Sequence, residues 1–157
     1  MKNLLTVGCV VALAAVGGSA GAQAEFPGPA LGYDLMFRSG QLLAADVRAG
    51  HLWLVSQKEY VGLGVIGEGG IGLGGVSAGA GPVTMFDCVH AIGCVSVALQ
   101  GKGFRPAWLS SWNDVWLAGG ELSVGYYLLK ATVSVFRPLS GSGGPVLSVG
   151  GGFQLFY

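Results

Sequence analysis

Apolar and polar residues alternate along the C-terminal end of the chain. From Leu147 to Tyr157 the odd-numbered positions are apolar or glycine, and the even-numbered positions from Ser148 to Gln154 are small or polar. A period of two is the signature of a β-strand with two unlike faces. In a soluble sandwich the apolar face would point to the core, whereas in a membrane barrel it would point to lipid. A barrel would place Leu147, Val149, Phe153, Leu155 and Tyr157 on lipid and Ser148, Gly150, Gly152 and Gln154 in the lumen.

Seven earlier segments show or begin the same alternation. They are Leu31–Phe37, Ala45–Val55, Tyr60–Ile66, Val76–Phe86, Val95–Gly101, Glu121–Leu128 and Lys130–Phe136. A strand that crosses a membrane needs about 9–11 residues, and bacterial barrels have an even number of strands with a minimum of eight. Eight strands with short connections fit this chain length. The pattern therefore predicts an all-β protein, an eight-stranded antiparallel up-and-down transmembrane β-barrel.

The glycine-rich segment Val61–Gly81 allows two interpretations. It holds ten glycines in 21 residues, with Glu68 as its one charge. The spacings Gly70-x-x-x-Gly74 and Gly75-x-x-x-Gly79 match the small-residue interface of packed transmembrane helices, as in a glycine-zipper helical membrane protein. Glycines at every second position favour two strands instead, because small inward residues suit a narrow barrel. We expect a turn between these strands at Gly67–Gly70.

Composition and charge exclude several classes of protein. Charged residues make up 10% of the chain, against roughly 25% in an average soluble domain. Eight basic and eight acidic residues cancel, so the chain has no basic field that would attract nucleic acid. A soluble secreted sandwich would need more charge on its solvent face. The hydrophobic content of 52% excludes a disordered chain.

The N-terminal residues fit a targeting signal. Lys2 precedes the apolar stretch Leu4–Val16, and Ala22-Gln23-Ala24 fits a small-residue cleavage site. The apolar stretch is shorter than the ~20 residues that a transmembrane helix needs. A lipoprotein signal at Cys9 is a weaker interpretation, because Cys9 comes before a full apolar region. We expect a cleaved signal peptide at residues 1–24 and an outer-membrane β-barrel at residues 25–157.

The C-terminus and the second half resemble known barrel proteins. The chain stops on Tyr157, with Leu155 and Phe153 two and four positions before it. This ending resembles the C-terminal signature of Gram-negative outer-membrane barrels, which the barrel-assembly machinery reads. The second half also resembles small outer-membrane barrel proteins of the myxobacterial type. The matching residues are Cys88, Cys94, Gly101–Gly103, Trp116–Glu121 and Phe153–Tyr157. The resemblance implies a barrel in the cell outer membrane and implies no activity.

Two cysteines, Cys88 and Cys94, remain after removal of the signal peptide. An even pair in an exported chain predicts one disulfide, and a hairpin across these positions can bring the two residues within range. Cys88, His90 and Cys94 are an alternative set of metal ligands. No second ligand cluster accompanies them, and exported thiols tend to oxidise. We expect a Cys88–Cys94 disulfide and neither a metal nor another cofactor.

The sequence contains no recognisable catalytic pattern. Neither His51 nor His90 has the nearby serine and carboxylate that lipid-modifying barrel enzymes use, and no P-loop, dinucleotide, HExxH or CxxC motif is present. We therefore expect that the protein is not an enzyme. The sparse charges in or near the strands should partly face the lumen, where opposite charges can pair. They are Asp34, Arg48, Glu68, Glu121 and Arg137.

The predicted connection Gly101–Asn113 carries a cationic and aromatic set, Lys102, Arg105, Trp108 and Trp112. Such residues suit the lipid headgroup region or a surface partner. The sequence thus predicts an integral outer-membrane barrel with a structural or surface-interaction role, surrounded by outer-membrane lipid. A lipid- or small-ligand-binding or lipid-modifying barrel is the alternative.

Overall fold

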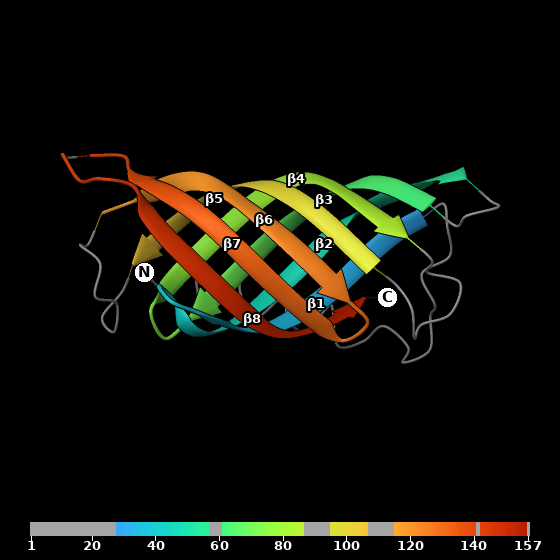
Figure 1. Cartoon of the computed structure of the whole chain (residues 1–157), viewed down its shortest axis with the longest axis horizontal. Helices are drawn as coiled ribbons and strands as arrows, with labels where there is room; N and C mark the ends of the chain where they lie inside the picture. The colour runs from blue at the N-terminus through green and yellow to red at the C-terminus, as the bar shows by residue number, and fades with distance from the viewer. Residues whose placement is uncertain (1–27, 57–60, 87–94, 107–114, 141, 157) are drawn as a thin grey trace, which may run out of the picture.

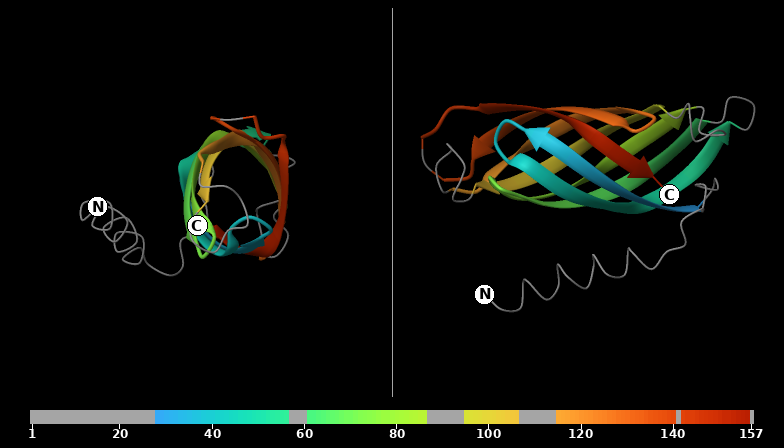
Figure 2. Two further views of the ribbon diagram at one scale, coloured as in Figure 1. Left: turned by 90° about the vertical axis from the view of Figure 1, so that its left-hand side faces the viewer. Right: turned by 90° about the horizontal axis from the view of Figure 1, so that it is seen from below.

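The computed structural model describes residues 28–56, 61–86, 95–106, 115–140 and 142–156. They form β1 (Gly28–Arg38), β2 (Leu42–Ser56), β3 (Val61–Gly72), β4 (Gly75–Phe86), β5 (Val95–Pro106), β6 (Leu117–Tyr126), β7 (Leu129–Pro138) and β8 (Val146–Phe156). Each strand pairs antiparallel with the next, and β8 pairs with β1 to close the barrel (Figures 1 and 2). The eight-stranded up-and-down barrel is confirmed. The sandwich alternative is wrong, because a single sheet closes on itself.

The period-two alternation determines which side chains form the inside and the outside of the wall. On β8 the Phe153 side chain is 61% exposed, whereas Gln154 beside it is 2% exposed. Leu147, Val149 and Leu155 also point outward, and Ser148 is buried inside. The predicted faces of the last strand are confirmed over these residues. Tyr157 lies outside the described residues.

The glycine-rich segment forms two strands, but the predicted turn at Gly67–Gly70 is wrong. β3 continues through it to Gly72, and the chain reverses at Leu73 and Gly74. The Leu73 and Gly74 amides donate to carbonyl oxygens of Leu43 and Gln41 at 3.0 and 2.7 Å, so this turn packs on the β1–β2 turn. The helical glycine-zipper alternative is also wrong for residues 61–86, which are strands. No helix long and apolar enough to cross a membrane occurs among the described residues.

Two strand boundaries in the second half differ from the prediction. β5 continues past Gly101 to Pro106, so Lys102 belongs to the strand and not to a connection. β6 begins at Leu117 and ends at Tyr126, two residues before the predicted end at Leu128. The reversal uses Tyr127 at φ +53°, a conformation usually given to glycine or asparagine. The sequence carries no such residue there, which is why the boundary could not be located.

The interior has three layers. Six buried apolar side chains occupy the end that holds the starts of β1 and β5: Ala30, Leu52, Ile66, Val83, Met85 and Ala98. At the opposite end Phe104, Leu117 and Phe136 form a second apolar cluster, in which the two phenyl rings lie 6.0 Å apart. Charged and polar side chains fill the space between the two clusters. The charged side chains between the two clusters are buried.

Candidate functional site

The middle layer of the barrel concentrates almost all of the charge. Of the ten charged residues among those described, eight point inward, and each is at most 5% exposed. They are four cations, Arg38, Arg48, Lys102 and Lys130, and four carboxylates, Asp34, Asp46, Glu68 and Glu121. All eight lie on the inward phase of their strands. Formal charges within this layer therefore balance.

Glu68 on β3 is the centre of the network. Its Oε1 lies 2.6 Å from Lys102 Nζ and 3.2 Å from Arg38 Nη2, and its Oε2 lies 2.9 Å from Lys130 Nζ. These cations come from β5, β1 and β7. One carboxylate thus compensates three buried cations, a geometry that offsets the large cost of removing each charge from water.

The remaining contacts extend the network on both sides of Glu68. Asp34 accepts from Lys130 Nζ at 2.6 Å and also from Arg48, whose Nη2 in turn donates to Gln154 Oε1 at 3.3 Å. Arg38 Nη1 lies 2.5 Å from Asp46 Oδ2. These bonds reach β8 through Gln154 and β2 through Asp46 and Arg48.

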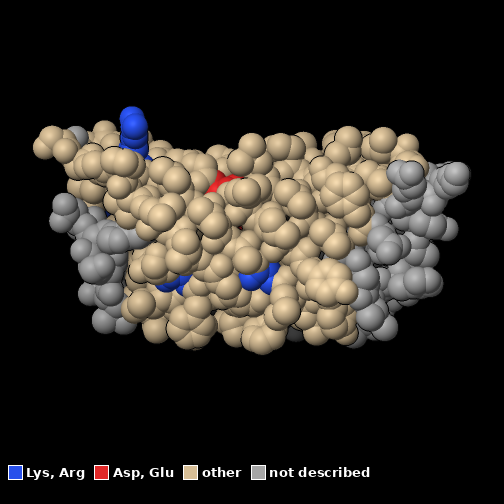
Figure 3. All heavy atoms as spheres, viewed as in Figure 1, with Lys and Arg blue, Asp and Glu red and all other residues tan. Residues whose placement is uncertain are grey.

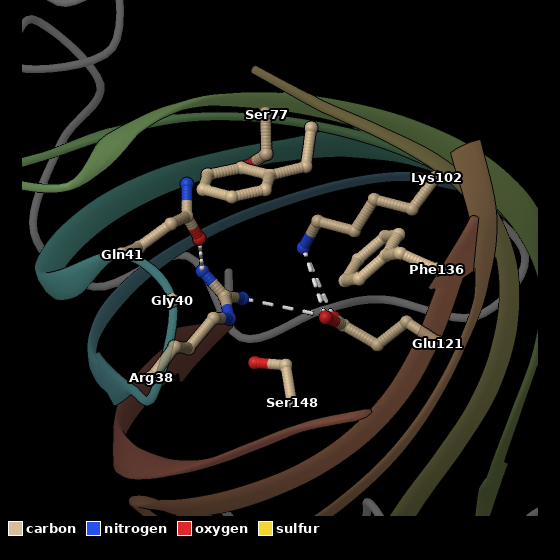
Figure 4. A pocket seen from close by; sticks show the side chains of 9 residues that line it. Arg38, Gly40, Gln41, Ser77, Lys102, Glu121, Phe136 and Ser148 are labelled. Carbon is tan, nitrogen blue, oxygen red and sulfur yellow. Dashed lines mark hydrogen bonds and ion pairs between the residues drawn. The ribbon is translucent and has the colours of Figure 1, made fainter. Parts of the chain in front are cut away.

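Glu121 on β6 completes the layer near the phenylalanine cluster. Lys102 Nζ lies 3.1 Å from both of its carboxylate oxygens, and Ser134 Oγ donates to Oε2 at 2.8 Å. Arg38 also faces it at 3.6 Å (Figure 4). Through these contacts the network joins seven of the eight strands, all except β4. It therefore connects the barrel wall across the lumen, in addition to the backbone ladders.

Inward glycines make room for the long charged side chains. A Cβ added at Gly70 would overlap the carboxylate of Asp46, and one at Gly125 would overlap Gln154 and Ser96. An eight-stranded barrel has an interior only just wide enough for side chains, so a larger residue at either position would displace the polar side chains that it meets.

Three carboxylates, Asp34, Asp46 and Glu68, place oxygens within 4.8 Å of one another, close enough for a metal ion. Each of them already contacts an arginine or a lysine. The four cations supply the positive charge that a metal would bring. The arrangement can therefore hold the wall together without an ion.

The lumen leaves little empty space. A cavity of about 10 Å³ lies beside Arg38, Gln41, Ser77, Lys102 and Glu121 (Figure 4). This volume fits about one water molecule. Ser77 Oγ and Gln41 Nε2 line this cavity and are buried without a hydrogen-bond partner among the described residues, which gives such a water its polar neighbours. This cavity, between side chains of the described residues, has no room for a larger ligand.

The structure separates the residues predicted for surface contact. Lys102 lies inside and is 4% exposed, so its assignment to the surface set is wrong. The reason is strand phase, since even-numbered positions of β5 point inward. Arg105 points outward, with its guanidinium 5.8 Å from the Trp116 ring. Trp108, Trp112, Cys88 and Cys94 lie outside the described residues, and the disulfide stays a prediction.

Sequence reasoning singled out half of the interior network. Asp34, Arg48, Glu68 and Glu121 pair inside as expected, whereas Arg137 points outward. Arg38, Asp46 and Lys130 were missed as members of the network. The sequence could have identified them, because each lies at an inward position of a strand in which apolar and polar residues alternate. His51 is on the outer face, with its ring 4.9 Å from the Trp53 ring, whereas the carboxylates of the described residues are inside.

Comparison with protein-family models, curated proteins and solved structures gave no match for this chain.

Proposed function

We propose that the protein is an integral outer-membrane β-barrel with a structural or surface-interaction role and no open channel. One observation carries the proposal: the barrel is apolar outside and charged inside. Leu35, Leu122 and Val133 are about half exposed on three different strands, while the charged network is buried. Figure 3 shows an outer face that is almost wholly uncharged. Such a surface is stable in a lipid bilayer and would aggregate in water.

The dimensions of the wall support the same conclusion. The strands have 10 to 15 residues, and a tilted membrane strand needs about 9–11. Large aromatic side chains point outward at the end where β2, β4 and β6 finish: Trp53, Phe86 and Tyr126. Aromatic residues gather at membrane–water interfaces, so this end suits the boundary between lipid and water.

The filled interior favours a structural role over transport or catalysis. The charged side chains of the described residues are buried, and the cavity of about 10 Å³ beside them is far below the roughly 300–1,000 Å³ of a small-ligand site. The lipid-modifying alternative would need a histidine, a serine and a carboxylate on one face, and within the described ranges His51 is the only histidine and lies on the face opposite the carboxylates. A role for the barrel-assembly machinery and the resemblance to myxobacterial barrels remain predictions.

Membrane insertion is tested by fractionation and by gel mobility. The protein should stay in the membrane pellet after carbonate extraction, and the folded form should migrate differently before and after boiling in SDS. Purified protein reconstituted in planar bilayers should give no stepwise conductance, because the lumen is filled. Release by carbonate together with unchanged mobility on boiling would refute the membrane proposal, whereas steady conductance would refute only the closed lumen.

Orientation is tested by labelling single cysteines on intact cells. Ser142 lies between β7 and β8 at one end of the barrel, and Leu128 lies in the β6–β7 turn at the other end, where β8 finishes (Figure 1). In a background without Cys88 and Cys94, a membrane-impermeant maleimide should label S142C and leave L128C unlabelled. Permeabilised cells should label both, which is the control for reactivity. Labelling of L128C alone would mean that the barrel is inverted.

A further inference from the structure

Only two charged residues of the described part point outward, and both lie at the same end of the barrel. Arg105 is the next-to-last residue of β5, and Arg137 is the next-to-last residue of β7. Both are exposed. Because β5 and β7 run in the same direction, the two guanidinium groups flank the start of β6. Ser142 follows β7 at this same end, which the expected labelling places outside the cell.

Trp116 occupies the space between the two arginines. It directly precedes β6, its ring lies 5.8 Å from the Arg105 guanidinium, and its carbonyl accepts from the Leu139 amide just after β7 at 2.8 Å. Arg137 is level with Gly103, two residues before Arg105, and neighbouring strands are about 4.8 Å apart, so the two backbone positions lie about 12 Å apart across β6. Two arginines at this spacing can hold one phosphate group from both sides.

Below this rim two cross-strand rows of the outer face consist largely of glycine and alanine. One cross-strand row consists of Ala49, Gly67, Ala80, Gly101 and Gly120, and the next contains Gly69, Ala78, Gly103 and Ala118. We call these nine residues the smooth face. It spans β2 to β6 at outward positions, and its Gly103–Ala118 pair adjoins Arg137, which pairs with Ala118.

The glycines of the smooth face are not required by the barrel itself. A Cβ at Gly67, Gly101 or Gly120 would meet no atom closer than 3.8 Å, and at Gly69 none within 4 Å. The inward glycines differ, because a Cβ at Gly70 would overlap Asp46. Glycine weakens a strand, because it has no side chain that packs against those of the neighbouring strands. Outward glycines instead allow another apolar molecule to approach the backbone closely.

We propose that the rim and the smooth face together bind a phosphorylated glycolipid of the outer leaflet. Arg105 and Arg137 hold a phosphate of its headgroup, Trp116 packs beside the sugar, and straight acyl chains lie flat against the smooth face. This inference rests on the proposed outer-membrane location and orientation. Charge complementarity favours a phosphorylated lipid. The only outward cations of the described residues, Arg105 and Arg137, lie next to the smooth face, where the acyl chains of this lipid would pack.

A second copy of the chain fits this surface less well. A symmetric pair would place the same patch on both subunits. In a membrane both copies would stand at one height, so the arginines of one rim would face those of the other. Like charges at an interface oppose association. A phosphorylated lipid meets the same rim with opposite charge.

The test counts lipid bound to the folded barrel in neutral detergent. Native mass spectrometry would compare rough-type lipopolysaccharide, its dephosphorylated form, phosphatidylglycerol and inorganic phosphate. We expect retention of the phosphorylated glycolipid, at least several-fold weaker retention of the dephosphorylated form, and no displacement by inorganic phosphate at equal concentration. R105Q/R137Q should weaken binding roughly tenfold, as expected for loss of two partly exposed charge contacts, and R105K/R137K should restore part of it.

A matched pair of variants tests the smooth face. G120L places a side chain in the face, whereas G151L places one at an outward glycine of β8 outside it; a Cβ at either has 3.8–3.9 Å of clearance. G120L should weaken glycolipid retention and G151L should not. Equal binding of phosphorylated and dephosphorylated lipid, or a dimer that G120L disrupts in the absence of lipid, would overturn the inference. Normal heat-modifiability in every variant would show that the outer-membrane proposal stands even when lipid binding fails.

Discussion

Glu68→Gln should lower the free energy of unfolding by about 3–5 kcal/mol, the usual cost of removing one partner from a buried ion pair. The amide has almost the same volume, so the change isolates charge. It leaves Arg38, Lys102 and Lys130 with one carboxylate fewer in a layer that is buried from bulk solvent. The measurement is urea unfolding of the barrel in lipid vesicles, followed by tryptophan fluorescence.

Two further variants identify the cause of the Glu68→Gln effect. Arg137→Gln removes an exposed charge and should change stability by no more than about 0.5 kcal/mol. Combining Glu68→Gln with Lys102→Met should cost less than the sum of the two single changes, because the second change removes one of the uncompensated cations. A loss below about 1 kcal/mol for Glu68→Gln would mean that the interior is hydrated and the network is not a structural centre.

Phe153→Arg should destabilise the membrane-inserted barrel by about 2–4 kcal/mol if position 153 lies near the bilayer midplane, and by less near the interface. Phe153 points outward between Leu35 and Leu129 on the neighbouring strands. An arginine there must displace lipid or bend toward the headgroups. The free energy of unfolding is again obtained from urea unfolding in vesicles. Assembly in cells is measured as the amount of protein whose migration on an SDS gel changes on boiling.

The adjacent residue provides the control for Phe153→Arg. Gln154 points inward, and its Oε1 accepts from Arg48 Nη2. Gln154→Glu introduces a charge that faces this arginine, so we expect a change within about 1 kcal/mol, the range of a single hydrogen bond. If the inward substitution proved more damaging than the outward one, the outer face would be in contact with water and the membrane proposal would fail.

The hydrophobic pattern alone was enough to predict the strands and their two faces. In each strand apolar residues recur at every second position. Because successive side chains of a strand point to opposite faces of the sheet, this repeat determines which residues face the inside of the barrel and which face the outside. The predicted faces of Ala131–Phe136 agree with the structure for this reason. The same local rule could not locate the turn in the glycine-rich segment, because glycine is compatible with both strand and turn. Residues Gly67–Gly70 remain a strand since Glu68 meets its cations only when it points inward.

The amino-acid sequence therefore determined the class of fold and the phase of each strand, whereas tertiary structure decided the interior partners and the outer surface. Glu68 meets Lys102 and Lys130, which are 34 and 62 residues away along the chain. Only closure of the barrel brings them together, so no local pattern contains that information. Lys102 illustrates the difference. Its neighbours in sequence suggest a surface loop, but β5 continues past Gly101, and the strand places the Lys102 ammonium inside the barrel. The smooth face likewise exists only because strand register aligns glycines and alanines from five strands.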